Sequence, residues 1–202
     1  MKAQTKHVAQ SLLLHELADI RLGHPFRGSI KQYTDGTVNV IQVRDTEITG
    51  EINHDSIVKT HLKTKKQPDW LQNGDVLFVA KGAKHHCVLV ENIKEQTVCS
   101  PHFFLVRLKP EYRALISPNF LCWQLNQQPA QRYFKTTAEG SMYLSIRRQV
   151  LESVPIKLLE IEKQNRLTAL HQCGVKEQKT LKKLIQNRQQ QLEAIALQEL
   201  GI

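Results

Sequence analysis

Residues 78–87, FVAKGAKHHC, bring together side chains that could bind an anion, hold a metal or take part in catalysis. An apolar run leads into Lys81, Gly82 and Lys84, and His85 and His86 follow directly. Adjacent residues of an extended chain point in opposite directions, so the two histidines are poorly placed to bind one metal ion. Lysines and histidines in such a turn suit contacts with phosphates or base edges, and the glycine allows a close backbone approach. The alternative is a solvated turn that carries ordinary lysines.

Sequence motifs typical of common enzymes are absent. The chain has no glycine-rich phosphate loop, no Gly-x-Gly-x-x-Gly, no Gly-x-Ser-x-Gly and no His-Glu-x-x-His. Pro68-Asp69 could begin a nuclease motif, but the strand predicted after it has no carboxylate where a second metal ligand would lie. The four cysteines form no Cys-x-x-Cys pair, which argues against structural zinc. We therefore predict no catalytic residue, no metal site and no cofactor bound by this chain.

The charge of the chain favours a polyanionic partner. It has 28 Lys and Arg against 19 Asp and Glu, a net charge of +9, and +7 of this falls on the first 150 residues. Arg44 follows a predicted strand that could aim it at a guanine, although Asp45 or Glu47 could pair with it instead. The other candidate DNA contacts outside the first stretch are Lys63, Lys65, Lys66, Arg132, Lys135, Arg147 and Arg148. For these the alternative is a solvated surface.

The first 150 residues alternate short apolar runs with turn-forming residues. Runs at 37–43, 76–80, 88–90 and 103–108 are typical of strands, and Ser117-Pro118 is typical of a helix start. Together they predict an α+β domain, a mixed sheet with helices, over residues 1–155. No segment resembles a membrane span or a signal peptide, and scattered cysteines suit a reducing compartment. We therefore expect a cytoplasmic protein that does not bind membranes.

Residues 156–202 have the composition of one long helix. Between 160 and 200 there is no proline and a single glycine, Gly174. Uninterrupted, such a helix would be ~60 Å long. Gly174 and Glu177 stand at positions that a strict heptad would fill with apolar residues, so we predict a coiled-coil-type helix whose apolar stripe is less regular than a heptad. We expect this stripe to be buried against another helix, of this chain or of a second one. The predicted dimerisation residues are Leu167, Leu170, Leu181, Leu184, Ile185, Leu192 and Ile195.

Several short phrases follow one another along the chain: Leu17-Ala18-Asp19-Ile20, Gly23-His24-Pro25-Phe26, Leu71-Gln72-Asn73-Gly74-Asp75-Val76-Leu77-Phe78, Gly140-Ser141 with Leu144-Ser145, and Val154-Pro155-Ile156 before the helix. Taken in order, they resemble the target-recognition domain of the specificity (S) subunits of type I restriction–modification enzymes. The resemblance covers nearly the whole chain. There are two departures: Leu159-Glu160 stands where the family usually has two prolines, and one recognition domain and one helix are present where a typical S subunit has two of each.

The resemblance implies a non-catalytic subunit that recognises double-stranded DNA. It would place the DNA before a methyltransferase (M) subunit, which carries S-adenosylmethionine. The recognition subunit would often also recruit a motor–nuclease (R) subunit. It also adds Ser141 to the candidate DNA contacts. A half-length subunit could homodimerise through its helix and read two half-sites, so we expect an interrupted palindrome as target. The alternatives are pairing with a different half-subunit, or a stand-alone dimeric DNA-binding regulator or scaffold that works without a methyltransferase.

Overall fold

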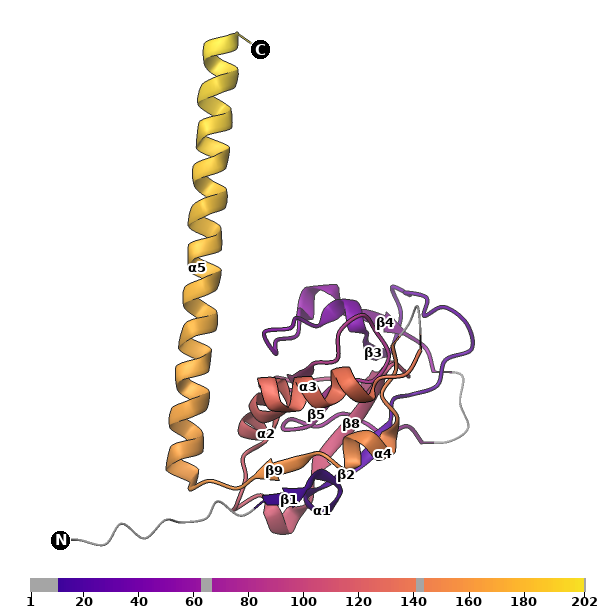
Figure 1. The fold of residues 1–202 in the computed structure, drawn as a ribbon. Helices are drawn as coiled ribbons and strands as arrows, with labels where there is room; N and C mark the ends of the chain where they lie inside the picture. Colours follow the sequence, from indigo (N-terminus) through magenta and orange to yellow (C-terminus); the bar gives the residue numbers. More distant parts are fainter. Residues whose placement is uncertain (1–10, 63–66, 141–143, 202) are drawn as a thin grey trace, which may run out of the picture. The chain divides into compact units, whose positions relative to one another are not determined.

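A computed structural model describes residues 11–62, 67–140 and 144–201 and divides the chain into two compact units, Met1–Gln164 and Asn165–Ile202. The first unit combines small β-sheets with short helices, and the second is formed by most of the long helix α5 (Ile161–Leu200). Figure 1 shows both units. The predicted α+β class with a long C-terminal helix is therefore confirmed.

The first unit extends further along the chain than the predicted boundary at residue 155. β9 (Pro155–Lys157) forms an antiparallel pair with β1 (Ser11–Leu13), which ties the end of the unit to its beginning. Beyond β9, the buried Gln164 donates from Nε2 to the carbonyl of Leu115 at 2.7 Å and accepts from the Ser117 backbone N–H at 3.0 Å. The first turn of α5 is thus held by contacts within the first unit.

A four-stranded antiparallel sheet, the central sheet, forms the core of the first unit. Its strand order is β2-β8-β5-β6, and its strands are β2 (Ala18–Leu22), β8 (Phe103–Leu108), β5 (Val76–Val79) and β6 (Cys87–Leu89). Every residue of β5 is buried, because both faces of the sheet are covered. On one face Phe78 contacts Phe134 of α3 (Gln128–Thr137), with ring centroids 4.7 Å apart. On the other face Leu77 and Val79 belong to an apolar cluster that includes Ile41 and Cys99.

Ile41 and Cys99 come from a second, three-stranded sheet. Its strand order is β4-β3-β7, and its strands are β4 (Val58–Thr60), β3 (Val38–Ile41) and β7 (Thr97–Cys99). β3 is antiparallel to β4 and parallel to β7. A smaller apolar cluster lies on this sheet, with Val40 and Val98 fully buried and Phe26 and Ile30 packed against it.

The remaining helices are short and their starts follow local sequence rules. α2 (Pro118–Asn126) has proline in its first turn, and the Ser117 hydroxyl accepts the Phe120 backbone N–H at 3.2 Å. α2 packs on β5 and β6 and against α3. The other short helices are α1 (Leu14–Leu17), α4 (Arg148–Glu152) and the 3₁₀ turns η1 (Val43–Asp45), η2 (His54–Ser56) and η3 (Pro110–Tyr112).

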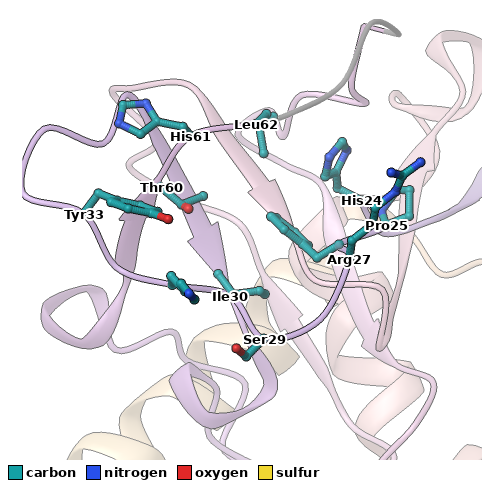
Figure 2. Close-up of a pocket in the computed structure, with 11 residues that line it drawn as sticks. His24, Pro25, Arg27, Ser29, Ile30, Tyr33, Thr60, His61 and Leu62 are labelled. Carbon is teal, nitrogen blue, oxygen red and sulfur yellow. The ribbon is translucent and has the colours of Figure 1, made fainter.

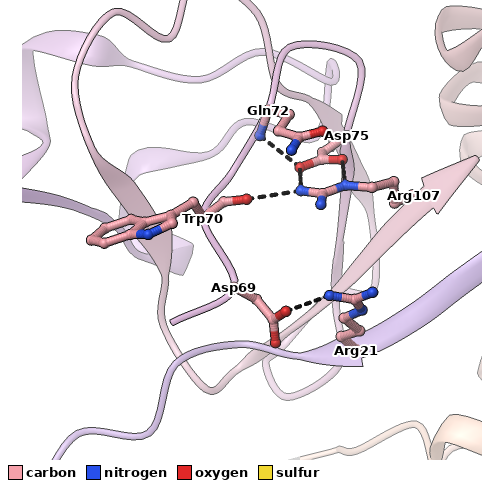
Figure 3. A network of polar contacts seen from close by, with 6 residues as sticks. All are labelled: Arg21, Asp69, Trp70, Gln72, Asp75 and Arg107. Carbon is pink, nitrogen blue, oxygen red and sulfur yellow. Dashed lines mark hydrogen bonds and ion pairs between the residues drawn. The ribbon is translucent and has the colours of Figure 1, made fainter. Parts of the chain in front are cut away.

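A polar network stands at one end of the central sheet. Asp75, just before β5, is almost fully buried and is bound by both Nε and Nη2 of Arg107 on β8, each at 2.7 Å. Arg107 Nη2 also donates to the Trp70 carbonyl at 2.8 Å, and the Gln72 backbone N–H donates to Asp75 at 2.7 Å (Figure 3). The network fixes the turn that leads into β5, and its glycine, Gly74, has φ +94°.

Loops gather at the opposite end of the central sheet, which we call the loop end. Leu22 and Phe78 are both register partners of Phe104, and Cys87 is the partner of Phe78. Segments 23–27, 80–86 and 100–102 therefore all leave the sheet at this end. Exposed side chains of these segments can contact a partner at this end of the sheet.

α5 has 40 residues, about 60 Å at the usual rise of ~1.5 Å per residue. Within the part of the chain that the structure describes, no helix is long and apolar enough to cross a membrane.

Candidate nucleic-acid interface

The turn that contains Lys81 and Lys84 lies at the loop end and is held from two sides. The backbone N–H groups of Ala80 and Lys81 donate to the His102 carbonyl at 2.8 and 3.1 Å, and that of Gly82 donates to Leu144 at 3.2 Å. Both lysine side chains are exposed. The backbone is fixed while the two cations extend into solvent, an arrangement suited to contacts with phosphate.

Gly82 has a packing role in this turn. A Cβ atom at this position would lie 3.2 Å from Cγ1 of Val79, which is closer than ordinary van der Waals contact. Gly82 is thus packed against the last residue of β5, and a close approach of a ligand to its backbone stays a prediction.

His85 and His86 are buried, with 6% and 7% of their surfaces exposed. The His85 ring stacks on Phe78, and its Nδ1 donates to the Val79 carbonyl at 2.9 Å. Nε2 of His86 lies 3.0 Å from the Thr46 hydroxyl, which itself donates to the Val43 carbonyl, so Nε2 is the donor. This corrects the expectation that these rings reach phosphates or bases, because their outer faces are covered by protein. The proposed interface therefore does not include these two side chains.

Arg44 lies on η1, a turn that is well anchored to its surroundings. The carboxylate of the buried Asp45 accepts a hydrogen bond from the Gln42 backbone N–H at 2.8 Å. The backbone carbonyl of Asp45 accepts one from the Asn53 backbone N–H, also at 2.8 Å. The contact between Arg44 and Asp45 is long, 3.8 Å, and 63% of the arginine side chain is exposed. Arg44 is therefore aimed outward, although the neighbouring Glu47 and Glu51 reduce the positive charge of this turn.

The segment that carries Arg147 lies beside the loop end. Ser145 forms isolated β-bridges to both Lys81 and Glu139, and Arg147 Nη2 pairs with Glu139 at 2.7 Å. Both partners of this ion pair are exposed, so a phosphate could replace the carboxylate at small cost. Lys135 and Arg132 are exposed on α3, which ends at Thr137, just before Glu139. The structure thus brings Lys81 and Arg147 together.

Arg148 is separated from this group. Its Nε donates to Glu152 at 2.7 Å within α4. Its side chain lines a hollow of about 310 Å³, together with Asp19 and Arg21. Arg147 precedes α4 and Arg148 is its first residue, and the two pair with different carboxylates, Glu139 and Glu152.

Four predicted contacts fall outside the described residues and remain predictions: Lys63, Lys65, Lys66 and Ser141.

A hollow of about 810 Å³ was not predicted from the sequence. It lies between segments 24–33 and 60–62, and its cations are Arg27 and Lys31. The available signal was two cations placed around Phe26 and Ile30, but a segment without helical or strand periodicity did not reveal which side chains face inward.

Among the described residues, no group of three His, Cys, Asp or Glu side chains is placed to hold a metal ion. Burial raises the pKa of the Cys99 and Cys122 thiols to about 12, and it raises the pKa of Cys87 well above its usual value. These thiols remain protonated at neutral pH and are poor nucleophiles.

Solved structures of restriction–modification proteins share this fold. The chain aligns with the type I S subunit from M. genitalium with a TM-score of 0.54 and 14% identity, over 84% of this chain and 40% of that one. It aligns with the HsdS subunit from Thermoanaerobacter tengcongensis with a TM-score of 0.59 and 16% identity, over 92% and 46%. It also aligns with a chain from a structural study of the assembly and conformational transition of the type I restriction–modification system. That alignment has a TM-score of 0.62 and 15% identity, over 91% of this chain and 46% of that one.

The resemblance seen in the sequence is therefore confirmed at the level of the fold. The chain spans less than half the length of the solved chains it matches. No protein-family model and no curated protein sequence matches it.

Proposed function

We propose that this chain, whose fold is that of one part of a type I specificity subunit, recognises a DNA sequence and directs a partner methyltransferase to it. The observation that carries the proposal is the fold match, which extends over both the β-rich unit and the helix in 91–92% of the chain for two of the solved structures. At 14–16% identity the match concerns the fold, so the function is inferred from the fold and the charge together.

The positive charge of the loop end supports DNA as the ligand. Lys81, Lys84 and Arg44 are exposed at or beside this end, and Arg147 has an exchangeable partner. Their backbone supports are fixed by hydrogen bonds, so the cations need little reordering when they bind. We assign base reading to side chains of the loop end and attribute non-specific affinity to phosphate contacts.

The exposed stripe of α5 supports pairing with a second copy of the chain. Leu170, Leu181 and Leu192 are spaced eleven residues apart, as are Leu184 and Ile195, which keeps them on one side over three turns. Each is more than half exposed in the single chain. An eleven-residue repeat fits side-by-side packing of long helices with little or right-handed supercoiling. Ile185 and the half-buried Leu167 complete the predicted dimerisation set.

A two-fold dimer would present two recognition units to the DNA. Its target would be two half-sites in inverted orientation, separated by a fixed spacer. The M subunits, and in some assemblies an R subunit, would dock on this dimer, and methylation chemistry with S-adenosylmethionine would belong to the M subunit.

The proposal is tested by reconstitution with the M subunit of the same system. The purified chain, the M subunit and S-adenosylmethionine are incubated with plasmid DNA, and the methylated positions are mapped by sequencing. We expect methylation at one recurring motif, which disappears when this chain is omitted. Methylation that does not depend on the chain, or the absence of a complex between the two proteins, would contradict the proposal. DNA binding without such a complex would favour a stand-alone regulator.

A further inference from the structure

The hollow between segments 24–33 and 60–62, which we call the lateral groove, has no role in the account above (Figure 2). Segment 24–33 is pinned at both ends. The His24 backbone N–H donates to the Cys99 carbonyl at the end of β7 at 2.8 Å, and that of Tyr33 donates to Lys59 on β4 at 2.9 Å. Phe26 and Ile30 pack on the three-stranded sheet. Because these two point inward, Arg27 and Lys31 are left exposed.

The electrostatics of the lateral groove favour an anion. Among the described residues that line it are Arg27 and Lys31 but no aspartate or glutamate. Within the described part of the chain, neither cation has a carboxylate partner at ion-pair distance. Asp35 is not among the described lining residues, but its Oδ1 lies 3.3 Å from Nε2 of His61, which lines the groove.

The other lining side chains suit a sugar–phosphate backbone. Ser29, Tyr33 and Thr60 supply hydroxyl groups, which together with Arg and Lys make many of the contacts that proteins form with phosphates. Pro25, Phe26 and Leu62 supply apolar surface for the sugars. The described part of the lining has no Asn, Gln, Asp or Glu, and these are the side chains that read adenine and cytosine edges.

The groove adjoins the loop end. The Gly23 backbone N–H donates to the Phe103 carbonyl at 3.0 Å, and His24, the next residue, lines the groove. His102, beside Phe103, accepts the backbone N–H of Lys81. Two backbone hydrogen bonds, Gly23 to Phe103 and Lys81 to His102, therefore connect the start of the groove with the Lys81 turn.

We propose that the lateral groove binds the phosphate backbone of duplex DNA next to the bases that the loop end reads, through Arg27 and Lys31. This inference rests on the proposed function and adds to it a surface that contributes affinity without sequence preference. The phosphate contact is assigned to Arg27 and Lys31, which are always charged. His24 also lines the groove, but partial burial lowers its pKa and keeps it neutral at pH 7.

The test measures binding of the full chain to a fluorescein-labelled 30-bp duplex of random sequence over a series of KCl concentrations. We expect Arg27→Ala and Lys31→Ala each to lower affinity about tenfold near 0.1 M salt and to reduce the log–log salt slope by about 1. Arg113→Ala is the matched control: Arg113 is exposed and follows η3, beyond the far end of β8, so its removal should leave the slope unchanged.

Arg27→Lys separates phosphate contact from base reading. A lysine keeps the charge but cannot form the two-pronged guanine contact, so the variant should retain both the salt slope and the sequence preference. A changed preference, or unchanged binding by the alanine variants, would overturn the inference while leaving DNA recognition intact. Competition by millimolar inorganic phosphate alone, without any effect of the alanine variants on duplex binding, would also overturn it. A wild-type chain that binds no duplex would instead refute the proposed function.

Discussion

Arg107 and Asp75 form a two-pronged ion pair in which Nε meets Oδ1 and Nη2 meets Oδ2, each at 2.7 Å (Figure 3). The carboxylate is 2% exposed, and its hydrogen bonds to Arg107 raise the pKa of the guanidinium further. The pair joins the turn before β5 to β8. The glycine–aspartate phrase that suggested a family resemblance is therefore explained by folding, because Asp75 is covered and cannot reach a ligand.

Replacing Asp75 with Asn should destabilise the fold without changing how folded molecules bind DNA. The variant leaves the Arg107 charge in a largely covered site, which should cost about 2–4 kcal/mol of unfolding free energy. Urea unfolding measures the loss. Asp69→Asn is the control, since Asp69 pairs with Arg21 at 2.5 Å where both side chains are nearly half exposed. That change should cost less than about 1 kcal/mol, and equal effects of the two variants would contradict the assignment.

The buried His86 should make stability fall in mild acid. Burial is the largest cause that lowers its pKa below the usual 6.5, so below pH 6.5 the unfolded chain binds more protons than the folded one. The free energy of unfolding should therefore be highest above pH 6.5 and decrease as pH falls toward the folded pKa. Urea unfolding at pH 7.5, 6.5 and 5.5 should show a smaller loss in His86→Gln. An unchanged pH dependence in that variant would assign the loss to other groups, among them His24, whose pKa is also lowered by burial.

Lysines and histidines of the same turn should give different phenotypes. Lys81→Ala and Lys84→Ala should each lower the log–log salt slope of DNA binding by about 1 and leave stability nearly unchanged, because both side chains are exposed. His85→Ala should lower stability, because it removes the stack on Phe78 and the hydrogen bond to Val79. It should not alter the salt slope. Salt-dependent fluorescence anisotropy and thermal unfolding of all three variants separate the two effects, and a reduced slope in folded His85→Ala would refute this division.

Charges on the α5 stripe should separate the proposed dimer. Leu181→Glu with Leu192→Glu places like charges where two copies would meet, so light scattering should report a monomer in place of a dimer. The control is Gln190→Glu, since Gln190 lies two and a half turns from Leu181 and therefore on the opposite side of the helix. A wild-type monomer at micromolar concentration would exclude self-association through this stripe.

The elements with strong local signals were predicted well from the sequence. Strand 103–108 is found as β8 (Phe103–Leu108), and the helix start at Ser117-Pro118 is found as a capped α2. The long helix spans Ile161–Leu200, within the predicted segment 156–202, whose first two residues belong to β9. The run at 37–43 is shorter in the structure, since β3 ends at Ile41 and the chain turns into η1 to bury Asp45. Periodicity and capping residues specify such elements locally.

Features that depend on distant contacts could not be predicted from local patterns. The burial of His86 follows from the position of Thr46 forty residues earlier. The separation of Arg147 from Arg148 follows from partners on different elements, Glu139 and Glu152. The lateral groove exists because segment 24–33 is pinned to β7 and β4, which no spacing within that segment indicates.

The most direct test of sequence-specific DNA recognition is selection from a random pool. The full chain is incubated with a library of duplexes that carry a random central region, and the bound duplexes are recovered and sequenced. We predict enrichment of two half-sites in inverted orientation with a constant spacer. Bound duplexes with the same sequence distribution as the input pool would contradict the account.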